Sequence, residues 1–256
     1  MMHLDKDEQL FRKRLLDQAN MAHTRNICIF SDFLNLNEQN IWMNLKNELP
    51  RIKYFTFGGF KEAERKILCF CGNDMLSEDE VDYPISCIKI VPSNQRFSDS
   101  LNHRDFLGAV LNLGLDRSKI GDILITDNEG YLFAHSGISE FIAEQLYKIK
   151  HTVVKAQLID RTEFDYKPSF KEITGTVSSV RLDSILSVAF NGSRSSLSGL
   201  IEGGKVYVGG KLVLSNSYTL KENDVVSVRG MGKFIYTGTS YQTKKGRYSV
   251  KILLYI

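Results

Sequence analysis

The sequence predicts an α+β protein made of three small domains. Apolar residues recur at helical spacing in some segments and alternate at strand spacing in others. The middle of the chain shows the order strand–helix–strand–strand–helix–strand, with polar stretches before and after it. The expected domains are an N-terminal α/β module (residues 1–74), a βαββαβ domain (83–162), and a C-terminal domain of two helices and a small sheet with a strand extension (178–256).

The composition is that of an ordinary soluble globular protein, with 43% hydrophobic and 25% charged residues among 256. No apolar run approaches the roughly 18 residues that a membrane-spanning helix needs. The N-terminus, MMHLDKDEQLFRKRLL, lacks a secretory core and predicts an amphipathic helix. We therefore expect a cytoplasmic protein without a membrane partner.

Cysteine and histidine spacing predicts neither a metal site nor a cofactor. The four cysteines, at positions 28, 69, 71 and 87, contain no CxxC pair, and the five histidines form no HExxH pattern. Reduced, buried thiols are expected. Cys69 and Cys71 lie in an apolar, strand-like run, and we expect their thiols to point to opposite faces of that strand.

Charge is unevenly distributed along the chain. The net charge is +3, but from Lys171 onward 12 lysines and arginines accompany 5 acidic residues, whereas the preceding part holds 21 and 25. A basic C-terminal part predicts a polyanionic partner. An ordinary basic domain would give the same balance, so charge alone does not decide between the two.

The N-terminal module is predicted to contain two helices and two strands. Helices are expected over residues 4–20 and 38–49, and strands over 52–57 and 64–70. The sequence Ser31–Leu34 predicts a turn before the second helix. None of these elements carries a pattern that indicates a function.

An acidic stretch then leads into the central domain. Residues 72–82 (GNDMLSEDEVD) predict a solvated linker, because their carboxylates have no histidine partner for acid–base chemistry. The order that follows is that of a ferredoxin-like split unit, which RNA-recognition domains share. Its elements are expected over residues 85–91, 103–113, 121–126, 130–134, 137–149 and 152–160, with a turn at 127–130.

Tyr131 and Phe133 share one face of the third strand of this unit. RNA-recognition domains stack bases on exposed aromatic residues of their central strands. The RNP-type sequence is missing here. Packing of both rings against a helix is therefore the expected role, and base stacking is the alternative.

The most distinctive run in this domain is LNHRDFLGAVLNLGLDRSKIGDILITD. His103, Arg104 and Asp105 start a helix, but no serine or cysteine nucleophile accompanies them, so no catalytic residue is expected. A basic helix start can bind phosphate, whereas capping and local ion pairing are the alternative. His103 and Arg104 are candidates for secondary RNA contacts.

A polar connection over residues 161–175 leads to the C-terminal domain, which predicts two short helices, a hairpin and further strands. Asn191-Gly192 ends the first helix, Ser193 caps the second, and Gly209-Gly210 makes the hairpin turn. A basic loop at 244–247 leads to the last strand. The apolar stripes of the two helices consist of Leu182, Ile185, Leu186 and Ala189, and of Leu197, Leu200 and Ile201.

The start of the second helix predicts an anion site. A capped helix start leaves backbone N–H groups and the positive dipole end facing outward. Arg194 and Ser195 lie in that first turn, where the dipole disfavours a cation. An external anion explains the arginine better than helix stability does, and an ordinary cap with a solvated arginine is the alternative.

The order of these pieces resembles the S-four RNA-binding domain, also called the alpha-L motif. The matching signals are RLDxxL, SR at the next helix start, IExGKVYV, a glycine turn and DVVSVRGxGKF. Gly209 departs from the family, which usually has asparagine in that turn. The resemblance implies RNA-phosphate contacts at Arg181, Ser193, Arg194, Ser195, Lys205, Lys211, Arg229 and Lys233, with secondary contacts at Lys244, Lys245 and Arg247.

Nearly the whole chain is similar to the YlmH family of bacterial S-four-domain proteins. The additional runs are FTFGGFKEAERKI (55–67), the run at 101–125 and the terminal TKKGR (243–247). The resemblance implies a non-catalytic protein, a monomer in solution, that binds ribosomal RNA and tRNA on the large ribosomal subunit. It also implies a role in rescue or quality control of stalled ribosomes.

Two other classes are weighed against this one. RNA-modifying enzymes of the pseudouridine synthase or methyltransferase type often carry S-four domains, but no glycine-rich cofactor loop follows a strand here. Two short helices joined by a glycine turn also fit a helix-turn-helix DNA binder. The hairpin that follows them argues against that second class.

Overall fold

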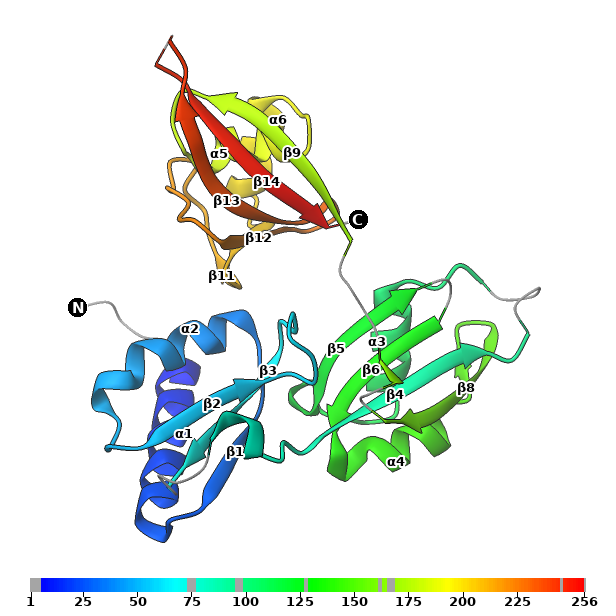
Figure 1. The fold of residues 1–256 in the computed structure, drawn as a ribbon. Helices are drawn as coiled ribbons and strands as arrows, with labels where there is room; N and C mark the ends of the chain where they lie inside the picture. Colours follow the sequence, from blue (N-terminus) through cyan, green and yellow to red (C-terminus); the bar gives the residue numbers. More distant parts are fainter. Residues whose placement is uncertain are drawn as a thin grey trace. The chain divides into compact units, whose positions relative to one another are not determined.

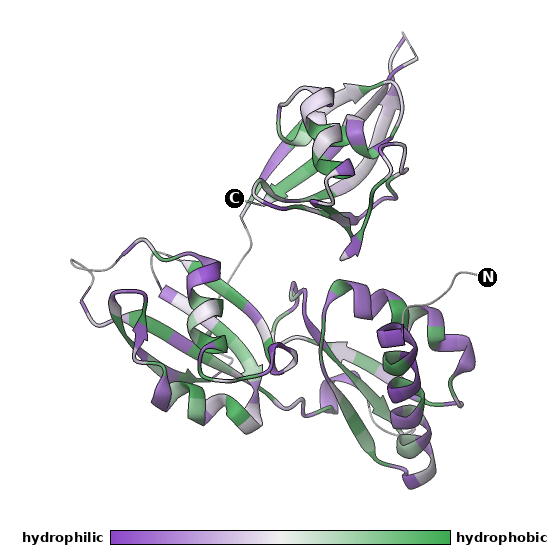
Figure 2. Cartoon of the chain, turned by 180° about the vertical axis from the view of Figure 1, so that it is seen from behind, coloured by the Kyte–Doolittle hydropathy of each residue, from purple (hydrophilic) through white to green (hydrophobic). Residues whose placement is uncertain are grey.

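The computed structural model describes residues 6–72, 77–94, 99–126, 129–160, 163–164, 169–244 and 246–255. The chain divides into two compact units, Met1–Asp165 and Tyr166–Ile256, called here the first and second units. The first holds a three-stranded and a five-stranded sheet, and the second a six-stranded sheet (Figure 1). Apolar residues follow the strands, whereas the first helix is largely hydrophilic (Figure 2). Among the described residues, no helix is long and apolar enough to cross a membrane.

The three-stranded sheet of the first unit has the order β1-β3-β2, and its neighbours pair antiparallel. Two helices cover one face, where Leu15, Trp42 and Phe70 are buried. The second helix starts with a capping box between Asn35 and Glu38. The elements are α1 (Lys6–Arg25), β1 (Cys28–Leu34), α2 (Leu36–Leu45), a 3-10 turn (Lys46–Glu48), β2 (Lys53–Phe57) and β3 (Lys66–Cys71).

The predicted turn at Ser31–Leu34 is wrong, because these residues form the second half of β1. Two polar residues in a row conceal the strand alternation, and the register with β3 shifts between Phe30 and Phe33. The hydroxyl of Ser31 accepts the backbone N–H of Leu68 at 2.9 Å, which satisfies a buried donor. The predicted helix over 4–20 is confirmed for its described residues and continues to Arg25.

The five-stranded sheet has the order β5-β6-β4-β8-β7, and all of its neighbours pair antiparallel. The predicted βαββαβ order is confirmed, with the short β7 added before the last strand. Asp127 and Asn128 of the predicted turn lie outside the described residues. The elements are β4 (Ile85–Pro92), α3 (His103–Leu111), β5 (Ile120–Thr126), β6 (Glu129–His135), α4 (Ser136–Gln145), β7 (Lys148–Ile149) and β8 (Thr152–Ile159).

The two sheets of the first unit pack against each other with the faces that their helices leave open. Phe133 is fully buried there, with its ring centroid 5.1 Å from that of Phe60 and 5.0 Å from that of Phe164. Tyr131 contacts Phe164 on the same side, at 5.3 Å. The expected packing of Tyr131 and Phe133 against a helix is therefore wrong. Residues of the N-terminal module and Phe164 cover these rings, so Phe133 cannot stack on a base.

Polar contacts reinforce this sheet–sheet interface. The guanidinium of Arg65 donates to the carbonyl oxygens of Phe33, at 2.9 Å, and Ile120, at 2.8 Å. The carboxylate of Asp122 accepts the backbone N–H groups of Glu64, at 2.6 Å, and Arg65, at 3.2 Å. Burial lowers the pKa of Arg65, and the carboxylates of Glu38 and Asp122 partly offset this effect. The RSKIGD segment of the distinctive run thus joins the two sheets.

The free thiols of Cys69, Cys71 and Cys87 are buried, as expected, whereas that of Cys28 is only half-buried. The predicted orientation of Cys69 and Cys71 is wrong. Cys69 and Cys71 both lie in the cluster between the sheets, whereas Phe70 points to the helices. Residues two apart in a strand share a face, so opposite faces were never available to them. Burial raises the pKa of Cys28 to about 11 and that of Cys87 to about 12.

The second unit is one antiparallel sheet of order β11-β10-β12-β13-β14-β9, with two helices on one face. Both predicted apolar stripes are confirmed, since their members are buried in or packed against one core. The turn at Gly209-Gly210 has φ of 54° and 75°, the left-handed pair that suits this hairpin. The elements are β9 (Phe170–Val177), α5 (Leu182–Ala189), α6 (Arg194–Glu202), β10 (Val206–Val208), β11 (Lys211–Leu212), β12 (Asp224–Val228), β13 (Gly232–Gln242) and β14 (Tyr248–Tyr255).

The predicted polar connection over residues 161–175 is wrong at its C-terminal end. Residues 170–175 belong to β9, an edge strand that pairs with β14 from Phe170 opposite Tyr255 to Val177 opposite Tyr248. Charged residues and Gly175 hide the strand in the sequence, and its partner follows only after the rest of the unit. Residues 161–162 and 165–168 lie outside the described residues.

Candidate nucleic-acid interface

The start of α6 is built as the sequence predicts. Ser193 is the N-cap, with its hydroxyl accepting the backbone N–H of Ser196 at 3.3 Å and lying 3.2 Å from the hydroxyl of Ser195. Arg194 is exposed in the first turn, which contains no acidic residue. Within the described part of the chain, Arg194 has no ion-pair partner. Free helix N–H groups, two hydroxyls and one guanidinium therefore face solvent together, an arrangement suited to phosphate.

A β-turn brings one further cation, Arg229, to this end of the unit, next to Lys205 and Lys233. The turn from Arg229 to Gly232 joins β12 to β13, and the backbone N–H of Arg229 donates to the carbonyl of Lys205 at 2.9 Å. A Cβ placed on Gly232 would lie 4.0 Å from the ring of Phe190, the residue that ends α5. The turn therefore lies between Lys205 and the α5–α6 connection. We call the surface formed by Ser193, Arg194, Ser195, Lys205, Arg229 and Lys233 the basic corner.

Two tyrosines flank the basic corner on the sheet face that α5 and α6 leave open. The guanidinium of Arg229 lies 5.0 Å from the ring centroid of Tyr207. The ammonium of Lys233 lies 3.9 Å from that of Tyr255. Tyr207 pairs with Ser227, and Ser227 pairs with Lys233, which places these residues in one row across the strands. Rings beside cations can hold a base next to its phosphate.

Sequence reasoning missed both tyrosines. Their signal is the strand alternation: Val206 and Val208 are buried, so Tyr207 between them must point to the other face. Tyr255 has no comparable local signal, because only the register of β14 with β13 and β9 places it beside Lys233.

Arg181 is not part of the basic corner. Its guanidinium donates twice to the carboxylate of Asp183, at 3.2 Å each. It lies at the N-terminus of α5, whose eight residues separate it by about 12 Å from the start of the α5–α6 connection. Lys211 is exposed across the Gly209-Gly210 turn, opposite Val208 and away from Lys205.

The loop between β13 and β14 forms a separate basic tip. Lys244 is exposed, and the guanidinium of Arg247 donates to the carbonyl of Thr176 at 2.6 Å. At about 3.3 Å per residue, the tip lies about 30 Å along β13 from Lys233. Lys245 lies outside the described residues. The tip can extend a contact with RNA but does not share a phosphate with the corner.

His103 and Arg104 belong to the first unit, at the start of α3. The side chain of Asn102 caps this helix and accepts the backbone N–H groups of Arg104, at 2.9 Å, and Asp105, at 3.3 Å. Asp105 forms an ion pair with Lys150 at 2.7 Å. Capping and ion pairing thus occupy Asn102 and Asp105, whereas the side chain of Arg104 is exposed.

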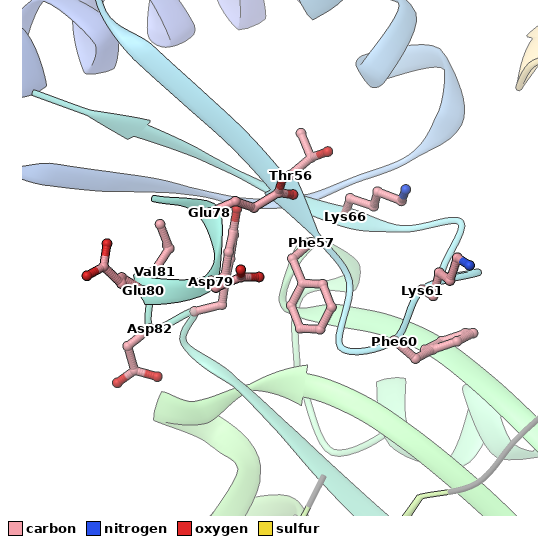
Figure 3. A pocket seen from close by; sticks show the side chains of 11 residues that line it. Thr56, Phe57, Phe60, Lys61, Lys66, Glu78, Asp79, Glu80, Val81 and Asp82 are labelled. Carbon is pink, nitrogen blue, oxygen red and sulfur yellow. The ribbon is translucent and has the colours of Figure 1, made fainter. Parts of the chain in front are cut away.

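A cavity of about 750 Å³ lies beside β2 in the first unit (Figure 3). Thr56, Lys61 and Lys66 line one part of it, and residues 78–82, all acidic except Val81, line another. Residues 78–80 are exposed, as expected for the acidic stretch, but form a 3-10 turn capped by Ser77. Among the described residues, no group of three histidine, cysteine or acidic side chains could hold a metal ion.

Comparisons with known proteins cover both units. Residues 78–163 match the family model described as "Putative RNA-binding domain in YlmH", and residues 180–226 match the S4 (S-four) domain. Over 252 residues the chain is 30% identical to the "Ribosome-associated protein quality control protein P2" of Bacillus subtilis (strain 168), covering 97% of this chain and 95% of that protein. The solved structure "Cell division protein ylmH from Streptococcus pneumoniae" has a TM-score of 0.51 and 21% identity, covering 64% of this chain and 97% of that one. This last likeness concerns the fold.

Proposed function

The chain belongs to the YlmH family of S-four-domain proteins, and from that premise we propose that it is a non-catalytic RNA-binding protein. Its targets are ribosomal RNA and tRNA on the large ribosomal subunit, in the rescue or quality control of stalled ribosomes. The protein acts as a monomer in the cytoplasm.

The basic corner is the observation that carries this proposal. Arg194 at a capped helix start, Arg229 in the turn after β12 and Lys233 at the start of β13 present charge to an anion larger than one phosphate. Tyr207 and Tyr255 add rings beside two of these cations, which suits a nucleotide better than an acidic protein segment.

The name of the relative from Bacillus subtilis, which refers to ribosome-associated protein quality control, supports the ribosome as the target. Phosphate contacts set affinity and its dependence on salt, but they carry little sequence information. The choice of RNA therefore has to come from RNA shape and from contacts outside the corner.

Crosslinking in cells tests the target. The chain is tagged, irradiated in cells and purified under denaturing conditions, and the attached RNA is sequenced. We expect large-subunit ribosomal RNA and tRNA to be enriched over a variant with Arg194→Ala and Lys233→Ala. Enrichment of messenger RNA alone would contradict the proposal. Ribosomal RNA modifications that disappear on deletion of the gene would contradict its non-catalytic part.

A further inference from the structure

The central domain has the element order of RNA-recognition domains, but its usual binding face is closed. Such domains stack bases on the aromatic residues of their central strands. Here Phe133 is fully buried, and Phe60 and Phe164 lie within about 5 Å of its ring centroid. Contact with RNA by this domain therefore has to use a surface other than the sheet face.

A groove of about 530 Å³ lies on the helical side of the domain. One wall is α3, and the other is the segment 145–150, which runs from the end of α4 through β7. The backbone N–H of Val154 donates to the carbonyl of Tyr147 at 2.9 Å, which holds the segment on β8. The residues that line it include Arg104, Gly108, Tyr147, Lys148 and Lys150.

The groove is cationic. It contains one carboxylate, that of Asp105, which forms its ion pair with Lys150 at 2.7 Å. The hydrogen bond from Lys150 lowers the pKa of Asp105, so this carboxylate stays ionised. Its negative charge is balanced by the positive charge of Lys150. Arg104 and Lys148 are exposed and have no ion-pair partner within the described ranges. Two positive charges are thus left for an external anion.

An aromatic ring stands beside these charges. Tyr147 is 71% exposed, the largest exposed fraction among the big apolar and aromatic side chains of the described residues. Its neighbour Leu146 is buried in the core of the domain, so the fold fixes the backbone position of Tyr147. An exposed ring that lines the same groove as unpaired cations is an arrangement that can hold an unstacked base and its phosphate.

Gly108 leaves the α3 wall of the groove without a side chain at this position. In a helix interior glycine is less stable than alanine by about 1 kcal/mol. Its backbone is helical here, and a Cβ placed on it would meet no atom within 4 Å. The fold therefore gives no steric reason for glycine at this position, whereas close approach of a ligand to α3 does.

We propose that the groove between α3 and residues 145–150 is a second RNA-binding site, in which Arg104 and Lys148 bind phosphate and Tyr147 stacks on an unpaired base. The inference rests on the proposed function and locates, within residues 78–163, where the first unit binds RNA.

The test measures binding of fluorescent decauridylate to the full chain at fixed salt. We expect Tyr147→Leu with Lys148→Ala to lower the affinity about tenfold, and Tyr147→Trp to retain it, because stacking needs only a flat ring. Phe141→Leu with Lys155→Ala removes an exposed ring and a cation outside the groove and is the matched control. Gly108→Gln should lower the affinity without lowering the unfolding midpoint, a combination that a purely structural role of Gly108 does not produce.

Groove variants that bind like the control would overturn the inference. If Arg194→Ala with Lys233→Ala still abolishes binding in that case, the groove fails and the proposed function stands. If neither set of variants changes binding, the proposed function fails as well.

Discussion

Arg65, just before β3, and Asp122, in β5, contact each other's segments across the sheet–sheet interface of the first unit. The carboxylate of Asp122 accepts the backbone N–H of Arg65 at 3.2 Å, while the Arg65 guanidinium donates to the carbonyl of Ile120, two residues before Asp122, at 2.8 Å. Each residue thus satisfies a backbone group on the other's segment. These hydrogen bonds and the apolar cluster around Phe133 both join the N-terminal module to the central domain, and the two parts form one compact unit.

Removing the carboxylate of Asp122 should destabilise the first unit. Asp122→Ala takes an acceptor from the N–H groups of Glu64 and Arg65, and we expect a loss of about 3 kcal/mol in the free energy of unfolding. Trp42, the single tryptophan, is buried in this unit and reports its unfolding in urea. Asp79→Ala, which removes an exposed carboxylate, is the control. Equal midpoints for the two variants would show that the contact adds no stability.

The half-buried thiol of Cys28 and the buried thiol of Cys87 should be unreactive while the chain is folded. Burial raises the pKa of Cys28 to about 11 and that of Cys87 to about 12, so at pH 8 both stay protonated. Iodoacetamide should modify them only in urea, as read by mass spectrometry with free cysteine as the positive control. Rapid modification of the folded chain would contradict the burial.

The same thiols predict how stability depends on pH. The folded pKa lies above the ordinary thiol value of about 9 that the unfolded chain regains. Above pH 9 the unfolded chain loses protons that the folded chain keeps, so stability falls as pH rises. The thiols' contribution should be complete below pH 9 and lost progressively toward pH 11 to 12. Substitution of Cys87 by alanine should reduce this decline, and an unchanged decline would assign it to other groups.

Much of the second unit could be predicted because its signals are local. The stripe of Leu182, Ile185 and Leu186, the cap at Ser193 and the glycine turn each occupy a few consecutive residues. Strand β9 was missed because its apolar residues are few and its partner β14 lies at the far end of the unit. Strand propensity is read from residues that are adjacent in the sequence, whereas an edge strand forms because of the strand that lies next to it in space.

In the candidate site, too, some features follow from local sequence and others only from the folded structure. The cations of the basic corner follow motifs, and their types and order are visible in the sequence. That Arg181 is held by Asp183, or that Tyr255 lies under Lys233, depends on side-chain geometry and on strand register. The closure of the central sheet face likewise depends on packing between Phe133 and Phe60, which come from different sheets.

The ring of Tyr255 should matter for RNA affinity independently of charge. Tyr255→Leu removes the ring beside Lys233, and we expect a loss of about fivefold or more in affinity for single-stranded RNA. The salt dependence should stay unchanged, since no cation is removed. Tyr255→Phe should bind like the parent chain. Tyr241→Leu, on the exposed distal part of β13, is the control. Equal losses of RNA affinity in Tyr255→Leu and Tyr241→Leu would show that the Tyr255 ring does not contribute to the RNA-binding site.

The central claim is that the basic corner anchors the chain to ribosomal RNA, and the salt dependence of its binding to large ribosomal subunits tests this most directly. Arg194→Ala with Lys233→Ala should weaken co-sedimentation and flatten the slope of log affinity against log salt by about 1.5, since two phosphate contacts are lost. Lys171→Ala with Lys221→Ala removes the same charge from exposed positions outside the corner and should leave the slope nearly unchanged. Identical slopes and affinities for the two double variants would contradict the claim.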